Sequence, residues 1–142
     1  MELVKKIKKS GCLFMGYSLE SGDQEILDVM NKHIKISDFV EQTAVLKKGG
    51  IIPTTSLVIG YPQETKETIN KTFDICEQSG IYPSAGYLLP QPGTPMYDYA
   101  LEKELIKDEE WFLIKMGDRQ DFTINFTKTL IIKKITIKTQ NK

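Results

Sequence analysis

The sequence contains few cysteines, no long apolar run and no excess of either charge. Its 142 residues include two cysteines, Cys12 and Cys76, which form no C-x-x-C pair and no disulfide scaffold, so we expect a reducing compartment. No apolar run reaches the roughly 18 residues of a membrane span, and no signal-peptide core follows Met1. The 19 basic and 19 acidic residues cancel, which excludes a global attraction to nucleic acid. We therefore predict a cytoplasmic protein that has neither a membrane nor a nucleic acid as partner.

The chain does contain apolar, strand-like stretches that alternate with helical patterns. Because 40% of its residues are hydrophobic, a chain of this length can bury a core as one domain. Apolar stretches predict strands at about 13–19, 51–59 and 81–89, and the second of them is rich in β-branched residues. Apolar residues at helical spacing predict helices at about 2–10, 23–31, 38–48, 65–78, 96–107 and 109–116.

This alternation predicts an α/β fold with parallel strands and right-handed crossovers. Three strands cannot close a barrel of ordinary size, so we expect an open sheet or a piece of a barrel. The nearly continuous apolar run at 51–59 is typical of a parallel strand that is covered on both faces. Because a short helical segment directly precedes the first strand, we expect the chain to be part of something longer.

Patterns within the helices predict which residues cap them and which face the core. Thr65 is the expected N-cap of the helix 65–78, and Ser37 or Asp38 can cap the helix 38–48. The residues expected to be buried are Phe39, Thr43 and Leu46, with Val40 and Ala44 beside them, and Ile69, Phe73 and Cys76.

Polar residues and glycines stand where each predicted strand ends. Glu20 and Ser21 follow the first strand, Gly60 follows the second, and Leu88 lies at the end of the third. In an α/β barrel, residues at the carboxyl ends of the strands line the reaction face, so these positions are candidates for chemistry. Ser21 followed by Gln24 also fits a capping box, which gives Ser21 a purely structural alternative.

Four segments in this order resemble the radical S-adenosylmethionine enzymes. Gly16-Tyr17-Ser18-Leu19-Glu20-Ser21-Gly22 resembles their G-x-E-S-G strand end, and Ile26-Leu27-Asp28-Val29-Met30-Asn31-Lys32 resembles the helix that follows. Val58-Ile59-Gly60-Tyr61-Pro62-Gln63-Glu64-Thr65 resembles their I-x-G-x-P-x-E-T loop, and Pro90-Gln91-Pro92-Gly93-Thr94-Pro95-Met96-Tyr97 resembles their P-x-P-G-T-P-L-Y segment. Together these segments cover about residues 11–97.

The resemblance implies a partial (β/α)6 barrel that binds S-adenosylmethionine and a [4Fe–4S] cluster. In this family, reductive cleavage of S-adenosylmethionine gives a 5′-deoxyadenosyl radical, which abstracts hydrogen from a small-molecule substrate. Residues 1–97 would be the C-terminal half of such a barrel, and residues 98–142 would be a helical extension with a lysine-rich tail.

The resemblance also implies which residues contact the cofactor, and it assigns no catalytic residue and no metal ligand. Glu20 and Ser21 match the position that contacts the ribose or methionine end of S-adenosylmethionine. Ser56, Val58 and Gly60 match the strand that packs by adenine, with serine in place of the first glycine, and Leu88 matches a strand that reads adenine through its backbone. Glu64 is expected to favour the N-terminus of the next helix instead.

The chain departs from the family in its cysteines. The family's cluster is held by a C-x-x-x-C-x-x-C loop, and the sequence has no such loop. We therefore expect the chain to be inactive alone and to need the missing N-terminal half of the barrel as its partner. A rival interpretation is a non-catalytic half-barrel that serves as a binding or assembly module, and a third is an unrelated α/β barrel fragment.

Predictions for the rest of the chain are coarser. Residues 117–121, with Asn125, resemble the cobalamin-binding branch of the superfamily, in which an upstream domain holds the cobalamin. Asp118, Arg119 and Asp121 form either a charge network or a solvated loop, and residues 129–139 form either an edge strand or a disordered tail. His33, the only histidine, is expected to be solvated.

Overall fold

The computed structural model describes residues 1–116, which fall into two units. The first unit contains Met1–Ile59 and Gln63–Gly86, and the second contains Gly60–Pro62 and the chain from Tyr87 onward. The predictions for Asp118, Arg119, Asp121 and Asn125 and for residues 129–139 lie outside the described residues. Within the described part, no helix has the length and apolarity needed to cross a membrane.

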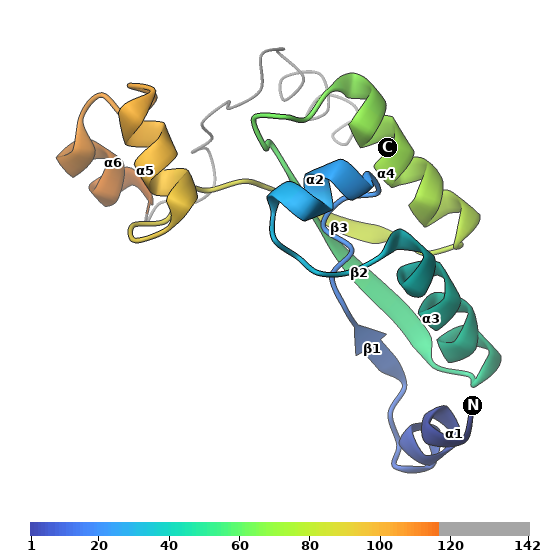
Figure 1. The fold of residues 1–142 in the computed structure, drawn as a ribbon. Coiled ribbons are helices and arrows are strands. Elements are labelled where there is room, and N and C mark those ends of the chain that lie inside the picture. Colours follow the sequence, from blue (N-terminus) through green and yellow to red (C-terminus); the bar gives the residue numbers. More distant parts are fainter. Residues whose placement is uncertain (117–142) are drawn as a thin grey trace, which may run out of the picture. The chain divides into compact units, whose positions relative to one another are not determined.

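The first unit is a parallel sheet with helices, as the alternating pattern predicted (Figure 1). Its three strands, in the spatial order β1-β2-β3, are β1 (Phe14–Gly16), β2 (Ile52–Ile59) and β3 (Pro83–Tyr87). Its four helices are α1 (Glu2–Lys9), α2 (Gln24–Val29), α3 (Ile36–Lys48) and α4 (Lys66–Gln78). The α/β class and the partial-barrel arrangement are therefore confirmed.

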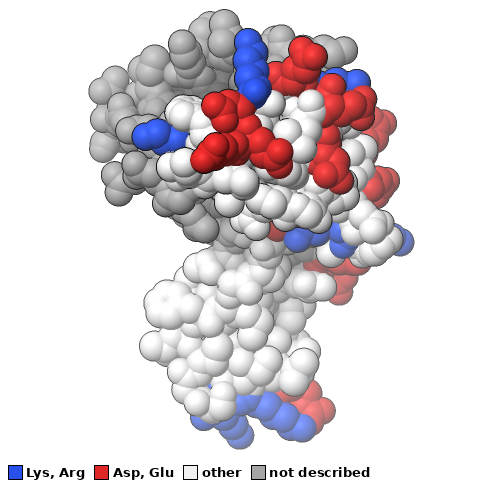
Figure 2. All heavy atoms as spheres, turned by 90° about the vertical axis from the view of Figure 1, so that its left-hand side faces the viewer, with Lys and Arg blue, Asp and Glu red and all other residues white. Residues whose placement is uncertain are grey.

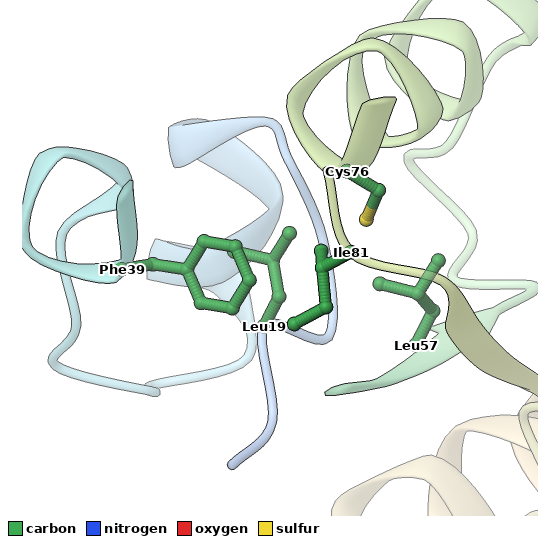
Figure 3. Packing of buried hydrophobic residues seen from close by; sticks show 5 residues of the cluster. All are labelled: Leu19, Phe39, Leu57, Cys76 and Ile81. Carbon is green, nitrogen blue, oxygen red and sulfur yellow. The ribbon is translucent and has the colours of Figure 1, made fainter. Parts of the chain in front are cut away.

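The core of this unit joins the sheet to α3 and α4, which lie on the same side of the sheet (Figure 1). Figure 3 shows side chains from separate segments that meet there. They are Leu19, Phe39, Leu57, Cys76 and Ile81. The ring of Tyr17 packs on Phe39 with centroids 5.2 Å apart, and its hydroxyl hydrogen-bonds Thr43. Burial of Phe39, Thr43 and Leu46 confirms the predicted stripe of α3.

Three expectations about the helices are wrong. Phe73 is 37% exposed, because Thr72 takes the inward position in α4 between Ile69 and Cys76. Val40 and Ala44 are exposed and lie off the buried stripe of α3. Helix α3 begins at Ile36, after Lys35, and has no side-chain cap, so neither Ser37 nor Asp38 caps it. Thr65 does cap α4, in a reciprocal capping box with Thr68.

The predicted cover on both faces of β2 is also wrong. Along β2, exposed and buried residues alternate, so only one face packs on the helices. On the other face Ile52 is 54% exposed and lies opposite Phe14, which is 61% exposed. Figure 2 shows a surface without charged side chains here, with the lysines of α1 at its lower edge. The described part of the first unit therefore presents an uncharged, partly apolar sheet face.

The second unit has its own small core around α5 (Pro95–Glu102) and α6 (Glu109–Met116). The buried members of this core are Tyr97, Ala100, Ile106 and Phe112. Thr94 caps α5, which ends earlier than predicted because Glu104, at φ 53°, leaves the helical conformation. The Tyr97 hydroxyl donates to Glu109 Oε1 at 2.6 Å, and this bond raises the pKa of Tyr97 to about 12. Acidic side chains gather on the surface of this unit (Figure 2).

A close backbone approach fixes the segment after β1 against α4. The Gly22 N–H donates to Thr72 Oγ1 at 2.8 Å. A Cβ atom on Gly22 would lie 2.5 Å from Thr72 Cα and 2.9 Å from the Lys71 carbonyl oxygen, closer than packed atoms come. The glycine of the E-S-G segment is therefore required by space, and it locates Glu20 and Ser21 relative to α4.

We expect Gly22→Ala to lower the free energy of unfolding by about 1–3 kcal/mol, since backbone atoms of α4 must move to admit the methyl group. Urea unfolding of the full chain measures this loss. Gly86→Ala is the matched control, because the atom nearest to its added Cβ would be the Leu57 carbonyl oxygen at 4.0 Å. An equal loss in both variants would contradict the steric explanation.

Candidate functional site

The segment that follows β1 has one residue more than the stretch of β2 that lies opposite it. Gly16 pairs with Thr54, whereas Glu20 bridges Leu57, so three residues (17–19) stand opposite two (55–56). This mismatch is a β-bulge, and it leaves the Leu19 N–H without a backbone partner on β2. The Leu19 N–H donates instead to Thr55 Oγ1 at 3.0 Å. The ladder resumes when the Glu20 N–H donates to the Ser56 carbonyl at 3.1 Å. Bulges of this kind redirect side chains and recur beside functional sites.

Glu20 itself lies at the centre of a strained three-residue turn. The Ser21 N–H donates to the Leu19 carbonyl at 2.9 Å, and Glu20 has a φ of 65°. A bond between residues i and i+2 around a positive φ is the rare form of the γ-turn. Side chains other than glycine adopt such a conformation at a cost, and residues held in it cluster at functional sites.

The carboxylate of Glu20 has one occupied oxygen and one without a partner. Its Oε1 accepts from Lys32 Nζ at 2.8 Å, and the side chain of Glu20 is 12% exposed. Its Oε2 is buried and has no hydrogen-bond partner among the described residues. Because a buried carboxylate oxygen is costly to leave unpaired, Oε2 is suited to accept a hydrogen bond from a ligand. Sequence reasoning found Glu20 but missed Lys32.

Asp23, and not Ser21, caps the helix that follows. Asp23 Oδ1 accepts from the backbone N–H groups of Glu25 and Ile26, while Oδ2 accepts from Lys71 Nζ at 2.7 Å. The Lys71 ammonium, together with the capping bonds, holds the pKa of Asp23 below its ordinary value. Ser21 is fully buried, and its Oγ accepts from the Asp23 N–H at 3.2 Å. The capping alternative for Ser21 is therefore wrong, and its contact with a ligand stays a prediction.

Ser56 and Val58 lie on β2 beside this turn. Ser56 is exposed, and its Oγ lies 2.8 Å from the Oγ of Ser18, a residue that sequence reasoning did not single out. Val58 is half-buried, and its N–H donates to the Glu20 carbonyl at 3.2 Å. The structure thus brings Glu20, Ser56 and Val58 together at the carboxyl end of the paired strands.

Gly60 and Leu88 both belong to the second unit and lie near each other. A Cβ atom on Gly60 would lie 3.5 Å from Leu88 Cβ, and Gly60 has a φ of 122°, which favours glycine. Glu64, in the first unit, is 4% exposed and directly precedes Thr65, the N-cap of α4. His33 is exposed, as predicted.

The described residues contain no group of three or more histidine, cysteine, aspartate or glutamate side chains that could hold a metal ion. Cys12 is half-buried, Cys76 is buried, and both are free thiols. Burial raises the pKa of Cys76, which disfavours the thiolate. The strand-end site can accept hydrogen bonds from a polar ligand, but the two cysteines of the chain, neither of which lies in it, do not fit an iron–sulfur cluster.

Comparison with known proteins gives a family match at this same region. The sequence profile of the radical SAM superfamily matches residues 1–76, which include the whole turn around Glu20.

Curated relatives carry similar sequences. An uncharacterized methyltransferase of Pyrococcus horikoshii is 28% identical over 111 residues, which are 78% of this chain and 24% of the relative. A threonylcarbamoyladenosine tRNA methylthiotransferase of Thermotoga maritima is 28% identical over 141 residues, 93% of this chain and 32% of the relative. A tRNA-2-methylthio-N(6)-dimethylallyladenosine synthase of Malacoplasma penetrans is 39% identical over 61 residues, 40% of this chain and 12% of the relative. The chain spans about a third or less of these relatives.

The Asp23–Lys71 pair predicts a loss of stability in acid. Since the folded pKa of Asp23 lies below its ordinary 3.8, the stabilisation is present above about pH 4 and is lost as the pH falls through the lowered pKa. Asp23→Asn keeps the cap and removes the ion pair, so we expect its stability deficit at neutral pH to shrink in acid. Asp23→Ala also removes the cap and should cost about 1 kcal/mol more.

Urea unfolding at about pH 7 and about pH 3 measures both effects. Asp74→Asn, an exposed position on α4, is the control and should show no deficit. A deficit of Asp23→Asn that does not change with pH would contradict the role of the ion pair.

Proposed function

The chain belongs to the radical S-adenosylmethionine superfamily, and from this membership we propose that it supplies part of the surface that holds S-adenosylmethionine in a radical enzyme. The observation that carries the proposal is the buried, unpartnered Oε2 of Glu20 at the end of β1. A carboxylate oxygen of this kind accepts a strong hydrogen bond from a ribose hydroxyl or an ammonium group, and S-adenosylmethionine carries both.

The residues of β2 beside Glu20 support the same assignment. Ser56 and Val58, which flank the Glu20 backbone on β2, are proposed to pack by the adenine. On the resemblance alone, Gly60 and Leu88 of the second unit are proposed to contribute backbone to adenine recognition, and Ser21 is proposed to contact the ribose or methionine end of S-adenosylmethionine. In such enzymes S-adenosylmethionine supplies a carbon radical that abstracts hydrogen; the residues of this chain bind and orient the cofactor.

The cluster is proposed to come from elsewhere. A [4Fe–4S] cluster needs several thiolates close together, and this sequence offers Cys12 and Cys76 alone. We propose that a polypeptide segment with the C-x-x-x-C-x-x-C loop, the N-terminal half of the barrel, is the partner, and that this chain is inactive without it. The names of the relatives favour methyl or methylthio transfer to a substrate of the complete enzyme. Use of cobalamin and a cytoplasmic location stay predictions.

A non-catalytic assembly module is the second candidate. The uncovered sheet face, where Phe14 lies opposite Ile52, favours it, because monomers seldom leave paired large apolar side chains exposed on a sheet. Both candidates require a partner chain, and they differ in whether the Glu20 site binds S-adenosylmethionine. Ligand binding therefore decides between them.

We expect the full chain to bind S-adenosylmethionine weakly, with a Kd on the order of 1 mM, and Glu20→Gln to weaken binding by about 10-fold or more. The amide keeps the size of the carboxylate but removes the charge that strengthens the hydrogen bond. Shifts of backbone amide resonances during titration measure the Kd. Glu25→Gln, an exposed carboxylate on α2, is the control, and equal affinity in Glu20→Gln and the wild type would refute the assignment.

Anaerobic incubation of the chain with iron and sulfide tests the second part of the proposal. We expect no visible absorption of a four-iron cluster and no cleavage of S-adenosylmethionine, because two distant cysteines cannot supply the ligands. The variant with both Cys12→Ser and Cys76→Ser should give the same spectrum. Cluster absorption that disappears in this variant would show that the chain holds its own cluster.

A further inference from the structure

The two partners of the Glu20–Lys32 ion pair are held by unusual backbone. Among the described residues, four residues other than glycine have a positive backbone φ: Glu20, Asn31, His33 and Glu104. Glu20 is one partner of the ion pair, and Asn31 and His33 are the residues directly before and after Lys32, the other partner. Left-handed backbone is costly for such residues and persists only where surrounding structure enforces it. The strain is therefore concentrated on the two segments that bring Glu20 and Lys32 together.

The chain before Lys32 ends α2 with a Schellman motif. Met30 is the C-cap of α2, and Asn31 follows it at a φ of 55°. The Asn31 N–H donates to the Asp28 carbonyl at 3.0 Å, and the Lys32 N–H donates to the Leu27 carbonyl at 3.0 Å. These are the two bonds that define the motif, and asparagine is among the few residues that tolerate its left-handed position. The backbone of Lys32 is thus fixed relative to α2.

The chain after Lys32 is fixed by one side chain of the same helix. Gln24 Nε2 donates to the Ile34 carbonyl at 3.0 Å, and Gln24 Oε1 accepts from the Ile36 N–H at 3.4 Å. His33, at a φ of 48°, turns the chain between these anchors. Lys32 is therefore held on both sides by hydrogen bonds to α2, although its own side chain is 40% exposed.

We propose that Lys32 is a positioning residue of the S-adenosylmethionine site, an inference that rests on the proposed function of Glu20. Lys32 holds Oε1 and so fixes the rotation of the carboxylate, which leaves Oε2 aimed at the ligand. A carboxylate that is already ordered loses less conformational freedom when a ligand binds, and a paired charge is less costly to keep buried. The ligand group that Oε2 accepts from is a hydroxyl or an ammonium.

Substitutions at Lys32 test this role. We expect Lys32→Met to weaken binding of S-adenosylmethionine by about 10-fold, which corresponds to about 1.4 kcal/mol. Lys32→Arg, which can still donate to Oε1, should restore the affinity to within about threefold of the wild type. Lys35→Met removes an exposed lysine three residues later and should leave the affinity unchanged. Amide shifts during titration give the Kd, and urea unfolding without ligand reports the stability of each variant.

Substitutions at Asn31 test the role of the backbone. Asn31→Gly keeps the left-handed position available and should bind like the wild type, whereas the β-branched side chain in Asn31→Val opposes it and should weaken binding as Lys32→Met does. If Lys32→Met does not fold, the Asn31 pair decides on its own. Titrations with adenosine and with methionine show whether the ribose or the amino group meets Oε2, since only the ligand that contacts Glu20 should lose affinity in Lys32→Met.

The outcomes separate the two proposals. Weak binding in Glu20→Gln together with wild-type affinity in Lys32→Met would overturn the role of Lys32 and leave the proposed function standing. Failure of Lys32→Arg to restore affinity in a folded protein, or equal binding by the two Asn31 variants, would also overturn it. Wild-type affinity in Glu20→Gln, or no binding by the wild type, would overturn the proposed function itself.

Discussion

The pairing of the segment after β1 with β2, in which three residues lie opposite two, governs the site. Because the segment 17–19 after β1 has one residue more than the stretch of β2 opposite it, one N–H must leave the ladder, and the Leu19 N–H donates instead to the hydroxyl of Thr55. This single hydrogen bond lets pairing resume at Glu20 with the backbone in a left-handed turn. Without that partner, the bulge would bury the N–H of the core residue Leu19 as an unsatisfied donor, which proteins rarely tolerate. The position of Glu20 is thus a consequence of strand pairing.

Local backbone motifs then carry the chain from the turn to the groups around it. Gly22 allows the loop to touch α4, Asp23 begins α2, and Asn31 ends it. Each motif satisfies donors or acceptors that a helix end or a bulge would otherwise leave open. Because Gly22, Asp23, Asn31 and their partners all belong to the first unit, the carboxylate and its lysine are arranged within that unit.

The sequence predicted the elements well and their surroundings less well. Periodicity located the strands, the buried stripe of α3 and the Thr65 cap, because these depend on local spacing and on one side-chain bond. It placed Glu20 at a strand end but could not show the bulge, which depends on which residue of β2 lies opposite. Asp23 and Ser21 are both good caps two residues apart, and only the helix start distinguishes them. The predicted burial of Phe73 was wrong because hydrophobicity favoured Phe73 over Thr72. The Thr72 hydroxyl faces inward, where it accepts a hydrogen bond from the Gly22 N–H.

The uncovered face of β2 is the most informative of these differences. An apolar run shows that residues can be buried, but it does not say by which partner, and here only alternate residues are buried. The exposed set contains Ser56, in contact with Ser18, next to the turn that holds Glu20. Apolar Phe14 and Ile52 lie on this face nearer the start of the strands, and polar serines lie nearer their ends. Such a gradient suits a barrel interior that is packed with side chains at its base and open to a polar ligand at its mouth.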